Sequence, residues 1–299
     1  MENLEILRKQ LLSKAKEQVV EEFSSPEIQL VKAVNLLEDL DRIFNLMAEH
    51  CIEWYSVHFP ELRETIEDNA LILKLVAELG KRENFEEEVL VQLVGEEELS
   101  KEIFQASKNS IGSELSEKDF AEVLELAVNA LRLKKQREQL ESYIQEKALG
   151  IAPNLSQIAG ALLAARLLSK AGGLKRLAML DSSKIQLLGA EKALFRHLKT
   201  KRKALPPKHG LILQHSFLQQ LKPWQRSAMS RALAGKIAIA ARIDFFSPKS
   251  RADGKLQDSL QAVFEKCQKI PEKPQRQFPV LERTRRPERK FFKKFNKRK

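Results

Sequence analysis

The residues whose types and spacing most clearly suggest chemistry are the cations between Gly189 and Gly210. This segment reads GAEKALFRHLKTKRKALPPKHG, and a helix over its first half would place Lys192 and Arg196 four residues apart on one face. Five more cations continue this positive surface into a loop closed by two prolines: Lys199, Lys201, Arg202, Lys203 and Lys208. Such a surface can bind phosphates. The alternative is an ordinary charged face in contact with solvent, because short basic runs are weak motifs.

The distribution of charge along the chain favours phosphate binding. Residues 1–150 contain 18 Lys and Arg against 32 Asp and Glu, a net charge of −14, whereas residues 151–299 contain 34 against 9, a net charge of +25. A strongly basic half indicates an anionic partner. Nucleic acid is the expected anion, because the basic half contains no long amphipathic lysine helix of the kind that lies on membranes.

Catalysis, metal binding and membrane insertion have little support in the sequence. The five histidines show no metal-ligand spacing with cysteine or carboxylate residues, and no glycine-rich phosphate loop or G-x-S-x-G motif occurs. Cys51 and Cys267 are too few for a disulfide framework and indicate a reducing compartment. No apolar run approaches the roughly 20 residues of a membrane helix. We therefore expect a protein that is not an enzyme and has no metal, cofactor or membrane partner; catalysis would need a cluster of titratable groups.

The spacing of apolar residues predicts helices throughout residues 1–150. One long helix begins at Ser25 and Pro26, as N-cap and first-turn residue, and another begins at Ser116 and continues to the end of this range. We expect the second helix to pair with residues 62–79 in an antiparallel coiled-coil arm, with the intervening residues at its tip. An ordinary helical bundle is the alternative. Apolar surface that two such helices cannot cover predicts a homodimer through the arm.

The rest of the chain predicts a compact helical domain and a basic tail. Glycine and alanine are frequent in residues 151–248, where helices can therefore approach closely, and Gly210 to His215 reads as one short extended segment. Residues 249–299 form the tail, which is predicted to be mostly disordered; from Arg283 onward it contains 10 Lys and Arg in 17 residues. The expected fold is all-α, with the coiled-coil region in residues 1–150.

Four segments of the basic half closely resemble the Nop domain. They read IAPNLSQIAGALLAARLLSKAGGLKRLA from Ile151, IQLLGAEKALFRHLK from Ile185, PPKHGLILQH from Pro206 and PWQRSAMSRALAGKIAIAARID from Pro223. Upstream, IEWYSVHFPEL and LILKLVAELGKRENF are similar to the coiled-coil region of the archaeal Nop scaffold protein of box C/D small ribonucleoproteins. The resemblance covers about residues 25–245.

The resemblance implies a non-enzymatic scaffold that joins a box C/D guide RNA, bound by a ribosomal-type kink-turn protein, to fibrillarin, the methyltransferase that modifies ribose 2′-hydroxyls. It also implies the binding residues. Those on the RNA side would be Lys192, Arg196, Lys199, Lys201, Arg202, Lys208 and His209. Those on the side of the kink-turn protein would be Gln186, Glu191 and Leu194. Leu194 and Phe195 are expected to pack rather than to touch RNA.

The sequence departs from the family pattern at its N-terminus. Family members usually begin with a globular α/β domain that binds fibrillarin, and no such domain precedes Leu4. We therefore expect this chain alone neither to bind fibrillarin nor to stimulate 2′-O-methylation. The alternatives are a spliceosomal-type relative that clamps a kink-turn RNA without a methyltransferase, and a coiled-coil adaptor. The resemblance implies a cytoplasmic location in archaea and a nucleolar one in eukaryotes.

Overall fold

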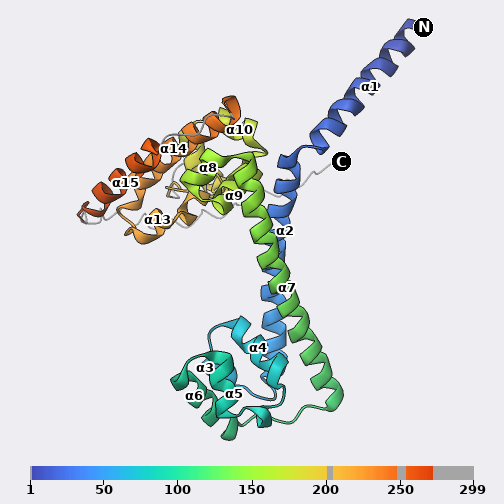
Figure 1. Cartoon of the computed structure of the whole chain (residues 1–299), viewed down its shortest axis with the longest axis vertical. Helices are drawn as coiled ribbons and strands as arrows, with labels where there is room; N and C mark the ends of the chain where they lie inside the picture. Colours follow the sequence, from blue (N-terminus) through green and yellow to red (C-terminus); the bar gives the residue numbers. More distant parts are fainter. Residues whose placement is uncertain (1, 201–204, 248–253, 272–299) are drawn as a thin grey trace, which may run out of the picture.

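The computed structural model describes residues 2–200, 205–247 and 254–271, and these residues form helices without any strand. The expected all-α fold is confirmed. Figure 1 shows two helical units at the two ends of a long helix pair, with helix α1 (Glu2–Phe23) extending away from them. Among the described helices, none combines the length and the apolar character that a membrane crossing needs.

The long helix pair, which we call the arm, consists of α2 (Pro26–Tyr55) and α7 (Glu117–Ile151), lying side by side in opposite directions (Figure 1). Both helices begin where the sequence predicts. The Ser25 hydroxyl accepts the Glu27 N–H at 3.3 Å, and the Ser116 hydroxyl accepts the Asp119 N–H at 3.2 Å. Each serine therefore satisfies a donor that its helix leaves without an intrahelical partner.

The predicted partner of α7 in the arm was wrong. Residues 62–79 are divided into α3 (Glu61–Thr65) and α4 (Asn69–Leu79) by an extended residue, Ile66. Asp68 then caps α4, accepting the Ala70 N–H at 2.9 Å. A helix of 11 residues can cover only one end of the 35-residue α7, whereas α2 has 30 residues and follows most of its length. Helix α4 instead packs against the outer end of α7.

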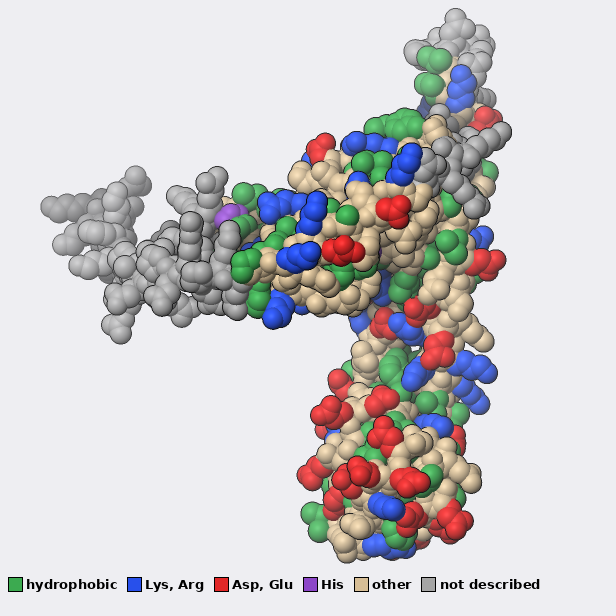
Figure 2. Space-filling model, turned by 60° about the vertical axis from the view of Figure 1, so that its left-hand side comes forward, with side chains coloured by type: hydrophobic (Ala, Val, Ile, Leu, Met, Phe, Trp, Pro, Cys, Tyr) green, Lys and Arg blue, Asp and Glu red, His purple; other side chains and the backbone are tan. Residues whose placement is uncertain are grey.

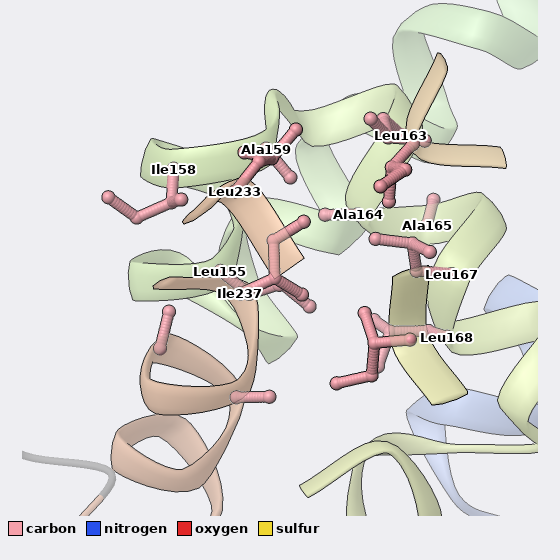
Figure 3. Packing of buried hydrophobic residues seen from close by; sticks show 14 of the residues in the cluster. Leu155, Ile158, Ala159, Leu163, Ala164, Ala165, Leu167, Leu168, Leu233 and Ile237 are labelled. Atoms are coloured by element: carbon pink, nitrogen blue, oxygen red, sulfur yellow. The ribbon is translucent and has the colours of Figure 1, made fainter. Parts of the chain in front are cut away.

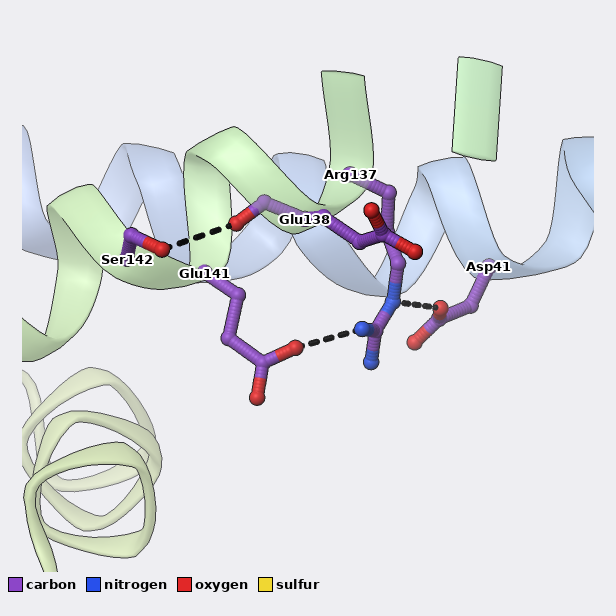
Figure 4. Close-up of polar contacts among 5 residues, drawn as sticks. All are labelled: Asp41, Arg137, Glu138, Glu141 and Ser142. Carbon is purple, nitrogen blue, oxygen red and sulfur yellow. Dashed lines mark hydrogen bonds and ion pairs between the residues drawn. The ribbon is translucent and has the colours of Figure 1, made fainter. Parts of the chain in front are cut away.

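A polar contact fixes the middle of the arm (Figure 4). Arg137 of α7 donates from Nε to Asp41 Oδ1 of α2 at 2.8 Å and also pairs with Glu141, one turn further along its own helix. All three side chains are partly buried. A guanidinium that bridges one carboxylate from each helix sets the register of the two helices.

The unit at the outer end of the arm, residues 56–116, is called the head. It contains α3, α4, the 3₁₀ turn η1 (Arg82–Asn84), α5 (Glu87–Val94) and α6 (Glu97–Lys108). Its core joins side chains of the head to side chains from the ends of both arm helices: Phe59, Leu73, Leu90, Ile103, Tyr55 and Val123. The head is therefore packed onto the arm through one continuous core.

The second unit follows α7 and is organised around the long helix α14. Its elements are α8 (Pro153–Ala159), α9 (Ala161–Ala171), α10 (Leu174–Met179), α11 (Ser182–Leu187), α12 (Glu191–Lys199), η2 (Leu211–Gln214), α13 (Ser216–Gln220), α14 (Arg226–Phe246) and α15 (Lys255–Gln268). In Figure 3, Leu155, Ala159 and Ala164 lie around Leu233 and Ile237 of α14. Small side chains let these backbones approach closely, which agrees with the alanine-rich composition.

Asp244 connects the end of α14 to the start of α8. Its Oδ1 accepts the backbone and side-chain N–H groups of Asn154 at 3.0 and 2.7 Å, and its Oδ2 accepts the Leu155 N–H at 2.8 Å. The first amides of a helix have no partner within the helix, and a carboxylate is well suited to accept them.

Helix α15 packs on the same core through Leu260, Phe264 and Cys267. This helix lies in the range 249–299, which the sequence analysis assigns to the tail. The compact unit therefore continues beyond residue 248. The prediction of disorder for the remaining tail falls on residues 272–299, outside the described residues.

Two buried histidines hold loops in place as neutral rings. His58 Nδ1 lies 3.2 Å from the Ser113 carbonyl oxygen, and its Nε2 accepts the Arg82 N–H at 3.1 Å. His215 Nε2 lies 3.1 Å from the Ile158 carbonyl oxygen, and its Nδ1 accepts the Phe217 N–H at 3.2 Å. Each ring thus has one donating and one accepting nitrogen. Burial lowers the pKa of both histidines from the ordinary value of 6.5.

We expect the free energy of unfolding to fall as the pH is lowered from 7.5 to 5. The pKa of each histidine is lower in the folded state than in the unfolded state. The contribution of each neutral ring to the free energy of unfolding is therefore complete above the unfolded-state pKa and is lost as the pH falls through the folded-state pKa. The loss is at most about 1.4 kcal/mol per pH unit for each ring. Urea denaturation at several pH values measures this. His215→Asn, which can still cap α13, should weaken the pH dependence. The exposed control His50→Gln should leave the pH dependence unchanged. Equal slopes of the free energy of unfolding against pH in the wild type and both variants would contradict the assignment of His215 as a buried neutral ring.

Candidate nucleic-acid interface

Helix α12 presents the cations that the sequence analysis singles out. Lys192, Arg196 and Lys199 are exposed and follow one another at spacings of four and three along this helix of nine residues. Among the described residues, none of the three forms an ion pair. None of the nine residues of α12 is buried. The helix therefore offers its positive charge to an external anion. Lys201 and Arg202 lie outside the described residues.

Two apolar side chains accompany these cations. Phe195 and Leu198 are 66% and 57% exposed, three residues apart on α12, and Leu205 in the following loop is 75% exposed. Contrary to the expectation that both residues pack, Phe195 is exposed among the described residues, whereas Leu194 is half-buried. Phe195 and Leu198 stay on the surface because no residue of α12 is buried. Apolar groups beside cations are suited to a partner in which a protein surface lies next to a phosphate backbone. The three-residue spacing of Phe195 and Leu198 in the sequence could have indicated such a surface.

The start of α12 depends on Gly189. This residue has a φ of +89°, and a Cβ at its position would lie 2.6 Å from Leu211 Cγ. Only glycine accepts both conditions. The Gly189 N–H donates to Glu191 Oε1 at 2.7 Å. Glu191, expected to face a protein partner, thus stabilises the turn that leads into its own helix.

The far end of the basic loop is fixed to α11. Gln186 donates from Nε2 to the Lys208 carbonyl oxygen at 2.6 Å, and the backbone carbonyl oxygen of Gln186 accepts the Gly210 N–H at 2.8 Å. The Leu211 N–H donates to the Leu188 carbonyl oxygen at 2.8 Å. Gln186, also expected on the partner side, therefore positions the loop. The segment Gly210–His215, expected to be extended, contains the 3₁₀ turn η2, because these two bonds pair its backbone with α11 rather than with a strand.

His209 lies in a cavity of about 570 Å³ beside this loop, whose lining includes Gly189, Gln214 and Arg226. Within the described residues its buried Nδ1 has no hydrogen-bond partner. Burial, followed by the charges of Arg226 and Lys208, lowers the pKa of His209. At neutral pH the ring is therefore uncharged. It can offer a hydrogen bond to a ligand but adds no positive charge to the surface.

The candidate interface thus contains three exposed cations on α12, with Lys208 and a neutral His209 across the loop. Figure 2 shows Lys and Arg side chains gathered over the upper unit, while the head at the bottom carries mainly Asp and Glu. Among the described residues, no group of three or more His, Cys, Asp or Glu is arranged to hold a metal ion. The arrangement can bind a phosphate backbone and an adjoining protein surface.

Several known proteins are similar to this chain over most of its length. The family model described as "Nop: snoRNA binding domain, fibrillarin" matches residues 36–266. An uncharacterised NOP5 family protein of Methanocaldococcus jannaschii is 40% identical over 216 residues, covering 72% of this chain and 51% of that protein. Nucleolar protein 58 of Homo sapiens is 40% identical over 230 residues, covering 76% of this chain and 43% of that protein. The chain spans about half the length of these relatives.

A solved structure described as the crystal structure of a fibrillarin/NOP5P complex is also similar. It is 27% identical in sequence, with a TM-score of 0.46, and the match covers 88% of this chain and 78% of that chain.

Removing the Gln186 side chain should loosen the basic loop. One hydrogen bond contributes on the order of 1 kcal/mol, so we expect Gln186→Ala to increase hydrogen exchange of the Gly210 and Leu211 amides by about fivefold. Exchange followed by NMR or mass spectrometry measures this. Gln145→Ala, an exposed position on α7, is the matched control. The role of Gln186 would be refuted if both variants exchanged these amides at the wild-type rate.

Proposed function

Because the chain belongs to the Nop family, we propose that it is a non-enzymatic scaffold that binds a box C/D guide RNA together with its ribosomal-type kink-turn protein. The observation that carries this proposal is α12, where exposed cations and exposed apolar residues alternate on one short helix. Lys192 and Arg196 would bind phosphates, and Phe195 and Leu198 would contact the neighbouring protein. Neither partner alone would then cover the whole surface.

The proposed RNA contacts are Lys192, Arg196, Lys199 and Lys208, with Lys201 and Arg202 from the same loop. His209 would contribute as a neutral hydrogen-bonding group, since its pKa is lowered by burial. Gln186 and Glu191 would support the surface indirectly, because both are engaged within the chain. Leu194 is half-buried and would contact the kink-turn protein only through its exposed edge.

Guided 2′-O-methylation of RNA is the process in which such a scaffold would take part. The description of the matched family includes fibrillarin, and we place fibrillarin among the partners of the assembled particle. The scaffold would contribute position and spacing, while the methyltransferase would supply the chemistry. A kink-turn RNA clamp that acts without a methyltransferase is the alternative. The proposed location is the cytoplasm in an archaeal cell and the nucleolus in a eukaryotic one.

Replacing Lys192 and Arg196 together by Ala should weaken assembly on a kink-turn RNA that carries its protein. Each lost phosphate contact should reduce the slope of log affinity against log salt by roughly one unit. Titrations at several salt concentrations measure this. The matched control is Lys170→Ala/Lys175→Ala, which removes two exposed cations from α9 and α10. Unchanged affinity and slope in the α12 variant would sink the proposal, as would tight, sequence-selective binding to the RNA without its protein.

A homodimer through the arm is the second element of the proposal. Helix α2 has a row of apolar side chains that the described part of the chain leaves about half exposed, since Leu36, Ile43 and Leu46 are 46%, 45% and 55% exposed. They recur at spacings of seven and three, as the contact positions of a coiled coil do.

Light scattering should therefore give about twice the chain mass of 34.2 kDa. Ile43→Glu/Leu46→Glu should shift the protein toward the monomer, because it places two charges in an apolar contact. Leu149→Glu, at another exposed apolar position on the arm, should leave the mass unchanged. A wild-type monomer at micromolar concentration would exclude the dimer and favour the clamp without a methyltransferase.

A further inference from the structure

The head carries an unusual concentration of negative charge. Residues 83–102, which include α5 and the first half of α6, contain eight Glu and one Lys. Within the described part of the chain, none of these eight carboxylates forms an ion pair. Like charges at this density repel one another, so the head gains stability when a cationic partner approaches.

A groove of about 1030 Å³ lies between α5 and α6 in this acidic region. Its apolar lining comes from Val91 and Phe104, which are both half-buried. Lys108 places its ammonium 5.2 Å from the centre of the Phe104 ring. The charged lining is mainly acidic, with four carboxylates, Glu86, Glu87, Glu88 and Glu97, and one further lysine besides Lys108, Lys101. A ligand that fits this groove must carry both cations and apolar or aromatic side chains.

We propose that this groove docks the C-terminal segment of the same chain, residues 283–299. The segment contains ten Lys and Arg together with Phe291, Phe292 and Phe295. Its cations match the glutamates, and its aromatic rings match Val91 and Phe104, where the Lys108 contact already shows that a cation can lie against an aromatic face. No other stretch of the chain combines aromatic residues with this density of positive charge.

The segment is long enough to reach the head. The 19 residues from Glu272 to Lys290 span up to about 65 Å when extended, whereas the 35 residues of α7 form a helix about 52 Å long. A docked segment would have its cations neutralised by the head. It would then be withheld from RNA until a competing polyanion displaced it.

Carbodiimide cross-linking of the full chain, which joins a carboxylate directly to an amine, locates the contact. At low salt we expect cross-links from the four groove glutamates to Lys290, Lys293 or Lys294, and we expect high salt to abolish them. Phe291→Ser/Phe292→Ser/Phe295→Ser leaves every carboxylate and lysine in place and should reduce the cross-links roughly tenfold. Cross-links that are absent from the wild type, or unchanged in the serine variant, would overturn the proposal.

Trypsin cleavage tests the same contact from the side of the head. Glu87→Gln/Glu88→Gln/Glu97→Gln should increase the rate of cleavage within residues 283–299 several-fold at low salt, to about the rate seen at high salt. The matched control, Glu64→Gln/Glu67→Gln/Glu122→Gln, removes three exposed carboxylates outside the groove. Equal cleavage in the two variants would refute docking in the groove. Protection that grows with chain concentration would show docking between copies and would refute docking within one chain.

Discussion

The seam between α2 and α7 is the interaction on which the rest of the structure depends. At its inner end, Leu30, Leu37 and Ile144 belong to the core of the compact unit around α14. At its outer end, Cys51 and Val123 belong to the core of the head. One helix pair thus forms part of two hydrophobic cores. Neither unit can move relative to the arm without exposing buried apolar surface, so the distance between them is set by helix length.

This fixed distance has an electrostatic consequence. Residues 56–116 carry 14 Asp and Glu against six Lys and Arg, while the opposite unit presents the cations of α12. The Debye length is about 8 Å at physiological ionic strength, much shorter than an arm of about 52 Å. The negative head therefore does not cancel the positive interface. An RNA that approaches α12 is attracted locally, and the head remains available for a cationic partner.

The sequence predicts local features of this fold better than it predicts which helices pack together. Ser25 and Ser116 were identified as helix starts because N-capping depends on neighbouring residues only. The predicted partner of α7 is wrong because the periodicity of apolar residues shows which face of a helix is apolar but not which other helix covers that face. The cations of α12 could be identified from their spacing. The role of Gln186 could not, because its bond to Lys208 joins residues 22 positions apart that only the folded chain brings together.

Helix α12 shows how an exposed, positively charged surface can be separated from the core that supports it. None of its nine residues is buried, so the helix itself contributes little to the hydrophobic stability of the unit. Its position comes from the flanking segments, because the turn at Gly189 packs against Leu211 and the loop after α12 is bonded at Lys208 to Gln186 of α11. The exposed face is therefore free to vary with the partner, whereas Gly189 and Gln186 are constrained by geometry. Changes on that face should alter binding with little change in folding, and changes at Gly189 or Gln186 should do the reverse.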